Sequence, residues 1–215
     1  MKRFAFTVLA AASLAAVLSA CVPLIVGGAV VGGSLVATDR RTSGAQLEDE
    51  GIELRAVNRI RENLGERAHV NASSYNRQVL LTGEVPNAQD KALVEQVVSR
   101  VENVRSIVNE LSILGNSTLT QRSSDSLVTG RVKASLVDAK DLYANAFRVV
   151  TERGTTYMMG RVTQREANRA TEIARSVQGV QKVVRIFEII SEEELLRTLP
   201  QAPQPEKGPT PKNNG

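Results

Sequence analysis

The sequence of 215 residues contains no tryptophan, one cysteine, one histidine and only 3% aromatic residues. A hydrophobic core must therefore consist mainly of valine, leucine, isoleucine and alanine, and no disulfide can form within the chain. A metal site that needs two histidines or several cysteines is excluded as well. The content of 42% hydrophobic and 23% charged residues is nevertheless that of a globular protein.

A strong net charge is also lacking. The formal charge is +4, and Lys2 and Arg3 fall in an N-terminal leader, which leaves about +2 for the rest of the chain. This charge is too weak to indicate nucleic acid, and the sequence shows no basic groove with interspersed aromatic residues. We predict no nucleic-acid partner.

Patterns of catalytic or cofactor-binding residues are missing too. The only histidine, His69, directly precedes a predicted strand residue, Val70, and has no nucleophile elbow near it, so we interpret it as an ordinary polar residue at a strand start. The isolated glycines Gly83 and Gly160 do not form a phosphate loop and indicate a bulge or close backbone approach instead. We expect no enzymatic activity, no metal and no cofactor. A hydrolase built on dispersed carboxylates is a third interpretation, behind the two given below.

What the sequence does contain begins with a leader. A positively charged start is followed by an apolar run over residues 4–18, then by Ser19, Ala20 and Cys21. This order resembles the signal peptide, here residues 1–20, and the lipobox of bacterial lipoproteins. The resemblance implies that Cys21 is acylated, for instance with palmitate, and becomes the lipid-anchored first residue of the mature chain.

The residue after the cysteine is Val22. An aspartate there commonly retains a lipoprotein in the inner membrane, so the resemblance implies sorting to the outer membrane, with the protein on the periplasmic face. One alternative is an ordinary cleaved signal peptide with a chance cysteine. A transmembrane anchor is disfavoured because the apolar run is shorter than the roughly 20 residues that a span requires.

A second apolar run covers residues 22–37 and contains four glycines. Gly28 and Gly32 have the GxxxG spacing of packed membrane helices. Because glycine weakens helices, we instead interpret residues 21–48 as the lipidated cysteine and a flexible, membrane-proximal tether. Arg40 and Arg41 close the apolar segment and are expected at the lipid headgroups.

The rest of the chain repeats one layout, at residues 49–114 and 124–190, with a linker at 115–123. Each copy is predicted to contain a helix, two strands joined by a short turn, a second helix and a third strand. In the first copy, apolar residues recur every four positions, as on one face of a helix: Ile52, Ala56, Ile60 and Leu64. Asn87 is expected to cap the second helix. One face of the last strand is predicted to carry Ile107, Leu111 and Ile113.

The second copy follows the same course. The stripe of its first helix consists of Val128, Val132 and Leu136. Thr163 and Glu166 have the spacing of a capping box at the start of its second helix. We predict that residues 191–215 contain one short helix followed by a disordered, proline-rich tail.

The shared αββαβ pattern, with a glycine and a valine at the end of each second strand (Gly83 and Val85, Gly160 and Val162), resembles the BON domain. This family occurs in bacterial envelope proteins and is named partly for phospholipid binding. The resemblance covers nearly all of residues 49–190 and implies an α+β fold of two tandem domains, each a three-stranded mixed sheet with two helices on one face. Together with the lipobox, it implies an outer-membrane lipoprotein that supports envelope integrity. Because one copy buries little core alone, we expect the copies to pack together.

The two copies differ in charge. The first has 8 lysines and arginines against 10 acidic residues, whereas the second has 11 against 7. The basic excess of the second copy includes Arg131, Lys133, Arg161, Arg165, Arg169, Arg175, Lys182 and Arg185. A basic group near an anionic bilayer gains roughly 1 kcal/mol, so the second copy is the better candidate for contact with lipid.

The copies also differ on the outer face of the first helix. In the second copy, the positions opposite the core stripe are Leu127, Gly130, Ala134 and Val137, with Arg131 and Lys133 at the edges. The aligned positions of the first copy are mostly polar, so we expect no apolar outer face there: Arg55, Asn58, Glu62 and Gly65. An apolar stripe with basic edges is typical of a helix at a bilayer interface. Packing of this face on the first copy is the alternative.

We therefore predict that the second copy binds anionic phospholipid, such as phosphatidylglycerol or cardiolipin, through Leu127, Gly130, Arg131, Lys133 and Val137. Members of the family that bind phospholipid carry large apolar or aromatic residues in this helix, whereas Leu127 is not aromatic. The first copy would dock on the second or recruit a protein partner. The runner-up is a periplasmic scaffold whose two copies bind envelope proteins, such as the outer-membrane assembly or division machinery, with lipid serving only at the anchor.

Overall fold

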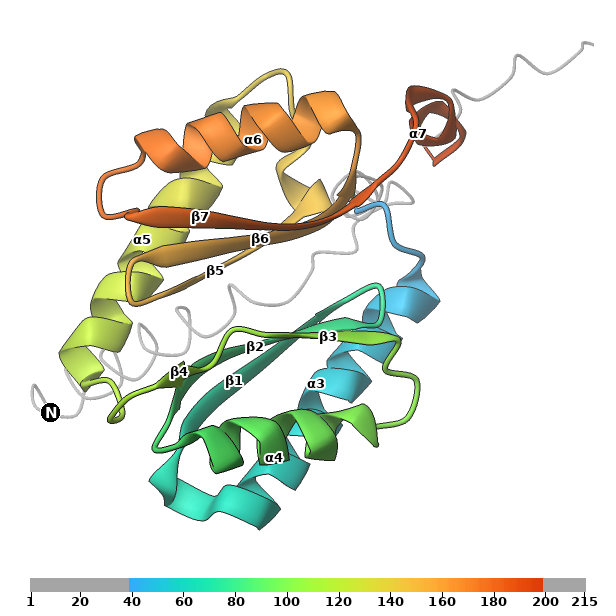
Figure 1. Cartoon of the computed structure of the whole chain (residues 1–215). Coiled ribbons are helices and arrows are strands. Elements are labelled where there is room, and N and C mark those ends of the chain that lie inside the picture. Colours follow the sequence, from blue (N-terminus) through green and yellow to red (C-terminus); the bar gives the residue numbers. More distant parts are fainter. Residues whose placement is uncertain (1–38, 199–215) are drawn as a thin grey trace, which may run out of the picture. The chain divides into compact units, whose positions relative to one another are not determined.

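The computed structural model describes residues 39–198. The predicted signal peptide, Cys21, most of the predicted tether and the proline-rich tail lie outside this range. The first repeat comprises α3 (Ser43–Leu64), β1 (His69–Tyr75), β2 (Gln78–Val85), α4 (Ala88–Ser99), β3 (Ser106–Asn109) and β4 (Ser112–Ile113) (Figure 1). The second comprises α5 (Leu119–Asp138), β5 (Phe147–Glu152), β6 (Thr155–Val162), α6 (Gln164–Ser176) and β7 (Lys182–Ile189), and α7 (Glu192–Thr198) follows it. No helix among the described residues is long and apolar enough to cross a membrane.

Each repeat contains one mixed sheet, as the resemblance to the BON domain implies. In the first repeat β1 and β2 are antiparallel, and β3 and β4 both run parallel to β2. In the second, β5 and β6 are antiparallel and β6 and β7 are parallel. Both helices of a repeat pack on the same side of its sheet (Figure 1). The α+β class and the two-helix, mixed-sheet architecture are thus confirmed.

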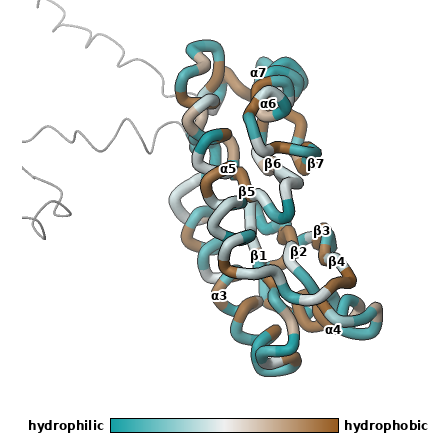
Figure 2. The backbone as a smooth tube through the Cα atoms, turned by 90° about the vertical axis from the view of Figure 1, so that its left-hand side faces the viewer, coloured by the Kyte–Doolittle hydropathy of each residue, from teal (hydrophilic) through white to brown (hydrophobic). Residues whose placement is uncertain are grey.

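The predicted core stripes are buried. Ile52, Ala56, Ile60 and Leu64 of α3 join Val94 and Val98 of α4 and the inward residues of β2 in one cluster. Val128, Val132 and Leu136 of α5 form the equivalent cluster with the alanines of α6. Hydrophobic and hydrophilic stretches alternate along α3 and α5 in Figure 2, as expected of helices with one buried face.

Both first helices begin earlier than predicted, α3 inside the presumed tether and α5 inside the presumed linker. The hydroxyl of Thr42 accepts a hydrogen bond from the backbone N–H of Ala45 and caps α3. Thr118 and Gln121 form a complete capping box at the start of α5. The first turns of these helices precede the buried core stripes, so the periodicity of those stripes does not include them, and the cap residues were the available signal.

The predicted caps of the second helices are confirmed. The Asn87 side chain accepts a hydrogen bond from the backbone N–H of Asp90 at the start of α4. Thr163 and Glu166 form the reciprocal capping box of α6. These caps fix where each crossover helix leaves its sheet.

The strand glycines mark sites of close backbone approach. A Cβ atom at Gly83 would lie 2.1 Å from the carbonyl oxygen of His69, and one at Gly160 would lie 2.5 Å from that of Ala146. Gly83 also has a positive φ of 111°, which side chains rarely adopt. Of the two predicted explanations for these glycines, a bulge or close backbone approach, the structure shows close approach at both.

The last strand of the first repeat is not continuous, and the prediction of one strand from Ile107 to Ile113 was wrong. It is divided into β3 and β4 at residues 110–111. The Asn109 side chain accepts a hydrogen bond from the backbone N–H of Leu111, and this local bend competes with the ladder. Leu111 is nevertheless buried in the core.

The two repeats share a third hydrophobic cluster, formed by the sheet faces that carry no helices. Its buried members are Tyr75, Leu80, Tyr157, Met159 and Ile186. Polar contacts between the repeats add to it, including Arg148 with Glu53 at 2.7 Å and Arg153 with Glu84 at 2.5 Å. The expected packing of one copy on the other is thus confirmed.

Candidate functional site: the outer face of helix α5

The outer face of α5 is exposed to solvent. Leu127 is 63% exposed and Val137 is 69% exposed, whereas the core residues Val128 and Leu136 on the opposite side are at most 5% exposed. Gly130, Arg131 and Lys133 are exposed as well. The structure thus brings all five predicted residues to one accessible surface. The alternative, in which this face packs on the first repeat, does not hold.

Leu119 extends this face, and the sequence-based prediction missed it. It is 78% exposed, and eighteen residues at 100° each place it at the same angular position as Val137. Because α5 was expected to start later, Leu119 was assigned to the linker. We call Leu119, Leu127, Gly130, Ala134 and Val137, with their basic edge residues Arg131 and Lys133, the α5 face.

The basic edges of the α5 face have no acidic partner between residues 39 and 198. Among the described residues, neither Arg131 nor Lys133 forms an ion pair, and Arg131 makes only a long contact of 3.5 Å to the carbonyl oxygen of Gln178. Lys133 and Val137 border a groove of about 550 Å³ that is also lined by Arg41 and Tyr75. The face therefore offers exposed apolar side chains beside positive charge.

Three other members of the basic excess form ion pairs. Arg161 pairs with Glu188 and Glu194, the latter in α7. Arg169 pairs with Asp141 at 3.0 Å. Arg165 lies 3.8 Å from Glu192, at the start of α7. The charge difference between the copies thus overstates the positive charge that the second repeat offers to a ligand.

The prediction that Arg40 and Arg41 sit at lipid headgroups was wrong. The Arg40 guanidinium donates hydrogen bonds of 2.7 and 2.6 Å to the carboxylate of Glu166 and one of 2.9 Å to the carbonyl oxygen of Arg161. Arg41 pairs with Asp39 and Asp49 and lies over the ring of Tyr75 at 4.3 Å. Arg40 is only 8% exposed. The segment before α3 is therefore fixed to the folded repeats.

His69 is more than the ordinary polar residue that the sequence suggested. Its Nδ1 lies 3.0 Å from Oε2 of Glu84, a carboxylate with no exposed surface. The same carboxylate accepts hydrogen bonds from Arg153 of the second repeat and from the backbone N–H and hydroxyl of Ser117. Burial alone would raise the pKa of Glu84, but these donors outweigh it and hold that pKa below its ordinary value. Glu84 thus joins the repeats.

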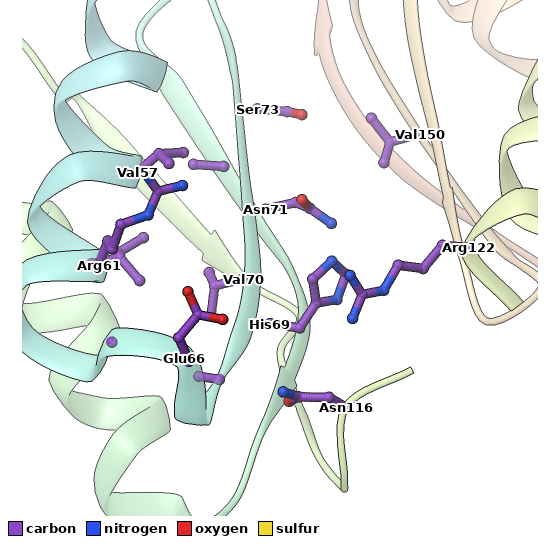
Figure 3. Close-up of a pocket in the computed structure, with 14 residues that line it drawn as sticks. Val57, Arg61, Glu66, His69, Val70, Asn71, Ser73, Asn116, Arg122 and Val150 are labelled. Carbon is purple, nitrogen blue, oxygen red and sulfur yellow. The ribbon is translucent and has the colours of Figure 1, made fainter. Parts of the chain in front are cut away.

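A cavity of about 580 Å³ lies beside this joint and is lined by residues of both repeats, including His69, Asn71, Arg122 and Val150 (Figure 3). Ligand atoms of His69, Glu84 and Glu152 lie within 4.8 Å of one another, a grouping compatible with a metal ion. However, both oxygens of Glu84 already accept hydrogen bonds from Arg153, Ser117 and His69. We therefore interpret the cluster as structural.

The first repeat also has an exposed apolar helix face, contrary to the prediction. Leu47 and Leu54 of α3 are 71% and 64% exposed. The predicted comparison used positions 55 to 65, in the polar half of the helix, and so missed the half that begins at Ser43. Both first helices therefore carry exposed apolar residues on their outer faces, contrary to the sequence-based comparison. What distinguishes the two faces is the charge of the residues at their edges.

The chain is similar to known proteins over both repeats. The model of the family described as BON domain matches residues 49–115 and 124–190. The chain is 37% identical over 175 residues to the outer membrane lipoprotein DolP of Haemophilus influenzae, which covers 80% of this chain and 90% of that protein. It is 30% identical over 154 residues to a 21 kDa hemolysin of Actinobacillus pleuropneumoniae, which covers 71% of this chain and 79% of that protein. The chain therefore belongs to the BON-domain family, as an outer-membrane lipoprotein with two BON domains.

Proposed function

We propose that this lipoprotein binds anionic phospholipid through the α5 face of its second BON domain and thereby supports the integrity of the outer membrane. It acts by binding and not by catalysis. Cys21 carries the acyl anchor, and the α5 face sets the orientation of the anchored domains on the periplasmic surface. The observation that carries the proposal is the exposure of Leu127 and Val137 beside Arg131 and Lys133, which form no ion pair within the described part of the chain.

The energies fit an orienting contact. Complete burial of a leucine or valine side chain contributes about 1.5–3 kcal/mol, and each basic group near an anionic surface adds about 1 kcal/mol. The sum of a few such contributions gives a free domain only weak membrane binding, which an excess of lipid is needed to reveal. It suffices for a domain that a lipid anchor already keeps beside the bilayer.

Cosedimentation of residues 39–215 with vesicles tests the proposal. This fragment lacks the anchor but keeps both repeats and the Arg40–Glu166 ion pair. We expect binding to vesicles that contain phosphatidylglycerol, little binding to pure phosphatidylcholine, and a marked loss when sodium chloride is raised from 50 to 300 mM, because exposed charges are screened.

Two double variants localise the contact. Leu127→Glu with Val137→Glu places two negative charges on the α5 face and should reduce binding at least tenfold. Leu47→Glu with Leu54→Glu makes the same change on α3 and should leave binding unchanged. Equal binding by all three proteins would sink the proposal and favour the scaffold interpretation, in which lipid serves only at the anchor.

A further inference from the structure

The N-terminal half of α3 carries an exposed stripe of small and apolar residues. Gly44, Leu47, Gly51 and Leu54 follow one another at intervals of three and four, which places them on one side of the helix. Together with neighbouring side chains they line a shallow hollow of about 460 Å³. None of these residues belongs to the hydrophobic clusters of the described chain. We call this stripe the α3 face.

Two glutamates and one arginine border the α3 face: Arg55, whose guanidinium lies beside Gly51, pairs with Glu48, which leaves the charge of Glu50 unbalanced. Glu50 is exposed at one edge and forms no ion pair with any residue from 39 to 198. At the other edge Glu48 is occupied by Arg55 and Asn103. An anionic bilayer would repel the unpaired Glu50 carboxylate. Its chemistry therefore favours a basic protein surface over a membrane.

The chain itself carries a surface of the complementary kind. The α5 face also combines exposed apolar side chains with a glycine, and its edge residues Arg131 and Lys133 are positive. No atom lies within 4 Å of the position that a Cβ atom would take at Gly130. The surface at this glycine is therefore open enough to receive a leucine side chain of another helix. Opposite edge charges would attract the two faces and fix their pairing.

A two-fold pairing of α3 with its own copy fits less well. In an antiparallel pair centred on Gly51, the Glu50 carboxylates of the two molecules would lie one residue from the centre and on the same side. Like charges at that position destabilise the contact. Pairing of α3 with α5 avoids this repulsion and uses both unpartnered faces.

From these features we propose that the protein self-associates head to tail, with the α3 face of one copy docked on the α5 face of the next. Such a contact joins two different surfaces, so it leaves one α3 face and one α5 face free at the ends and can extend into rows. About four residues a side take part, against 20–30 in a standard interface. The contact is therefore weak and depends on anchoring of the copies in one membrane.

The inference shares the α5 face with the proposed function, so lipid and a neighbouring copy compete for it. Full-length lipoprotein is reconstituted in phosphatidylcholine vesicles as two differently tagged variants, Leu54→Cys and Leu127→Cys. Both substitutions lie on exposed positions, and circular dichroism checks the fold. Mild oxidation should produce a mixed disulfide between the cysteine introduced at position 54 of one variant and the cysteine introduced at position 127 of the other, which the two tags identify. Its yield should be at least fivefold higher than the yield of disulfide-linked dimer from either variant alone.

Two controls separate this contact from random collision. Leu54→Cys mixed with Glu172→Cys, an exposed position on α6, gives the collisional yield, and the wild type gives the background of Cys21. Addition of Glu50→Lys to Leu54→Cys should lower the mixed disulfide to the collisional level. A mixed yield equal to that level, or a dominant Leu54→Cys homodimer, would overturn the inference.

Anionic lipid distinguishes this inference from the proposed function. Replacement of half the phosphatidylcholine by phosphatidylglycerol should reduce the mixed disulfide several-fold if the α5 face also binds lipid. A strong mixed disulfide that ignores the lipid composition would support self-association and count against lipid binding by α5. Salt-sensitive vesicle binding without a specific mixed disulfide would support the proposed function and overturn self-association.

Discussion

Asp49 and Asp125 occupy the same position in the two repeats, three residues before the core stripe of the first helix, and each binds the backbone of the hairpin turn in its own repeat. Asp49 accepts hydrogen bonds of 2.8 Å from the backbone N–H groups of Asn76 and Arg77. Asp125 accepts bonds of 2.8 and 3.0 Å from those of Arg153 and Gly154. The turn residues Asn76, Arg77, Arg153 and Gly154 all have positive φ. Arg77 and Arg153 rarely adopt this conformation, whereas Gly154 adopts it readily, so the helix carboxylate helps to hold each turn at its arginine.

Replacement of this carboxylate should destabilise the repeat that contains it. We expect Asp125→Asn to lower the free energy of unfolding by about 1.5–3 kcal/mol, because hydrogen bonds to a charged acceptor are lost while the turn N–H groups stay in place. Urea unfolding followed by circular dichroism measures the change. The exposed Asp138→Asn, on the same helix, should change it by less than about 0.5 kcal/mol. Equal effects of the two substitutions would contradict the role of Asp125.

The Arg40–Glu166 ion pair offers a second test. Arg40→Ala leaves the buried Glu166 carboxylate without its main partner, and loss of one member of a buried pair costs about 3–5 kcal/mol. The double variant Arg40→Met with Glu166→Gln removes both charges and should recover much of the loss. Thermal unfolding compares the three proteins. If Arg40→Ala unfolds like the wild type, the segment before α3 is not held by this contact.

Acid should weaken the joint between the repeats through Glu84. The pKa of Glu84 lies below its ordinary value of 4.5, so the ionised carboxylate contributes stability that is complete above about pH 4.5 and is lost as the pH falls through the lower folded-state pKa. Glu84→Gln should therefore be less stable than the wild type at pH 7, and the difference should shrink at pH 3.5. Urea midpoints at the two pH values measure this.

Glu152 provides the matched control for that experiment. Burial, together with the nearby charge of Glu84, raises its pKa, so its ionised form is disfavoured in the folded protein. Glu152→Gln should leave stability at pH 7 unchanged or slightly higher. A loss at pH 7 as large as that of Glu84→Gln would contradict the assignment of opposite roles to the two carboxylates.

Replacement of glycine by alanine should lower the stability at one position and raise it at another. Gly160→Ala would place a Cβ atom 2.5 Å from the carbonyl oxygen of Ala146 and should destabilise the second sheet by at least about 1–3 kcal/mol. Gly130→Ala meets nothing within 4 Å in the middle of α5 and should stabilise the helix by about 0.5–1 kcal/mol. Melting temperatures of the two variants check the prediction, and a shift of the same sign in both would contradict it.

The features that repeat in both copies could be predicted from the sequence. Core stripes such as Ile52–Ala56–Ile60 and the caps at Asn87 and Thr163 depend on local patterns, and the repeat supplied each pattern twice. The predicted α5 residues were also found on one exposed face, because burial of Val128, Val132 and Leu136 leaves only one direction for the opposite side of a helix. Their predicted ligand is tested by the vesicle experiment.

The missed features depend on contacts between residues far apart in the chain. Glu84 has no local signal, because its partner Arg153 follows 69 positions later. Arg40 was misplaced for the same reason, since Glu166 is 126 residues away. Asp49 and Asp125, by contrast, stood at equal distances before their core stripes in both copies, and that repetition was a usable signal. Charge counts also misled, because two arginines of the basic excess, Arg161 and Arg165, pair with carboxylates of α7.

The ion pair of Arg40 with Glu166 determines the length of the chain that connects a lipid anchor to the folded domains. If Cys21 carries the lipid anchor, residues 21–39, a stretch of 19, connect it to the Arg40 contact, whereas the predicted tether of residues 21–48 had 28. Fully extended, 19 residues span at most about 65 Å. A shorter connecting chain raises the effective concentration, at the membrane surface, of every membrane-facing group on the domains. Loss of the Arg40–Glu166 ion pair would lengthen this connecting chain. It would thereby weaken the contact of the domains with the bilayer without a change in any residue that touches lipid.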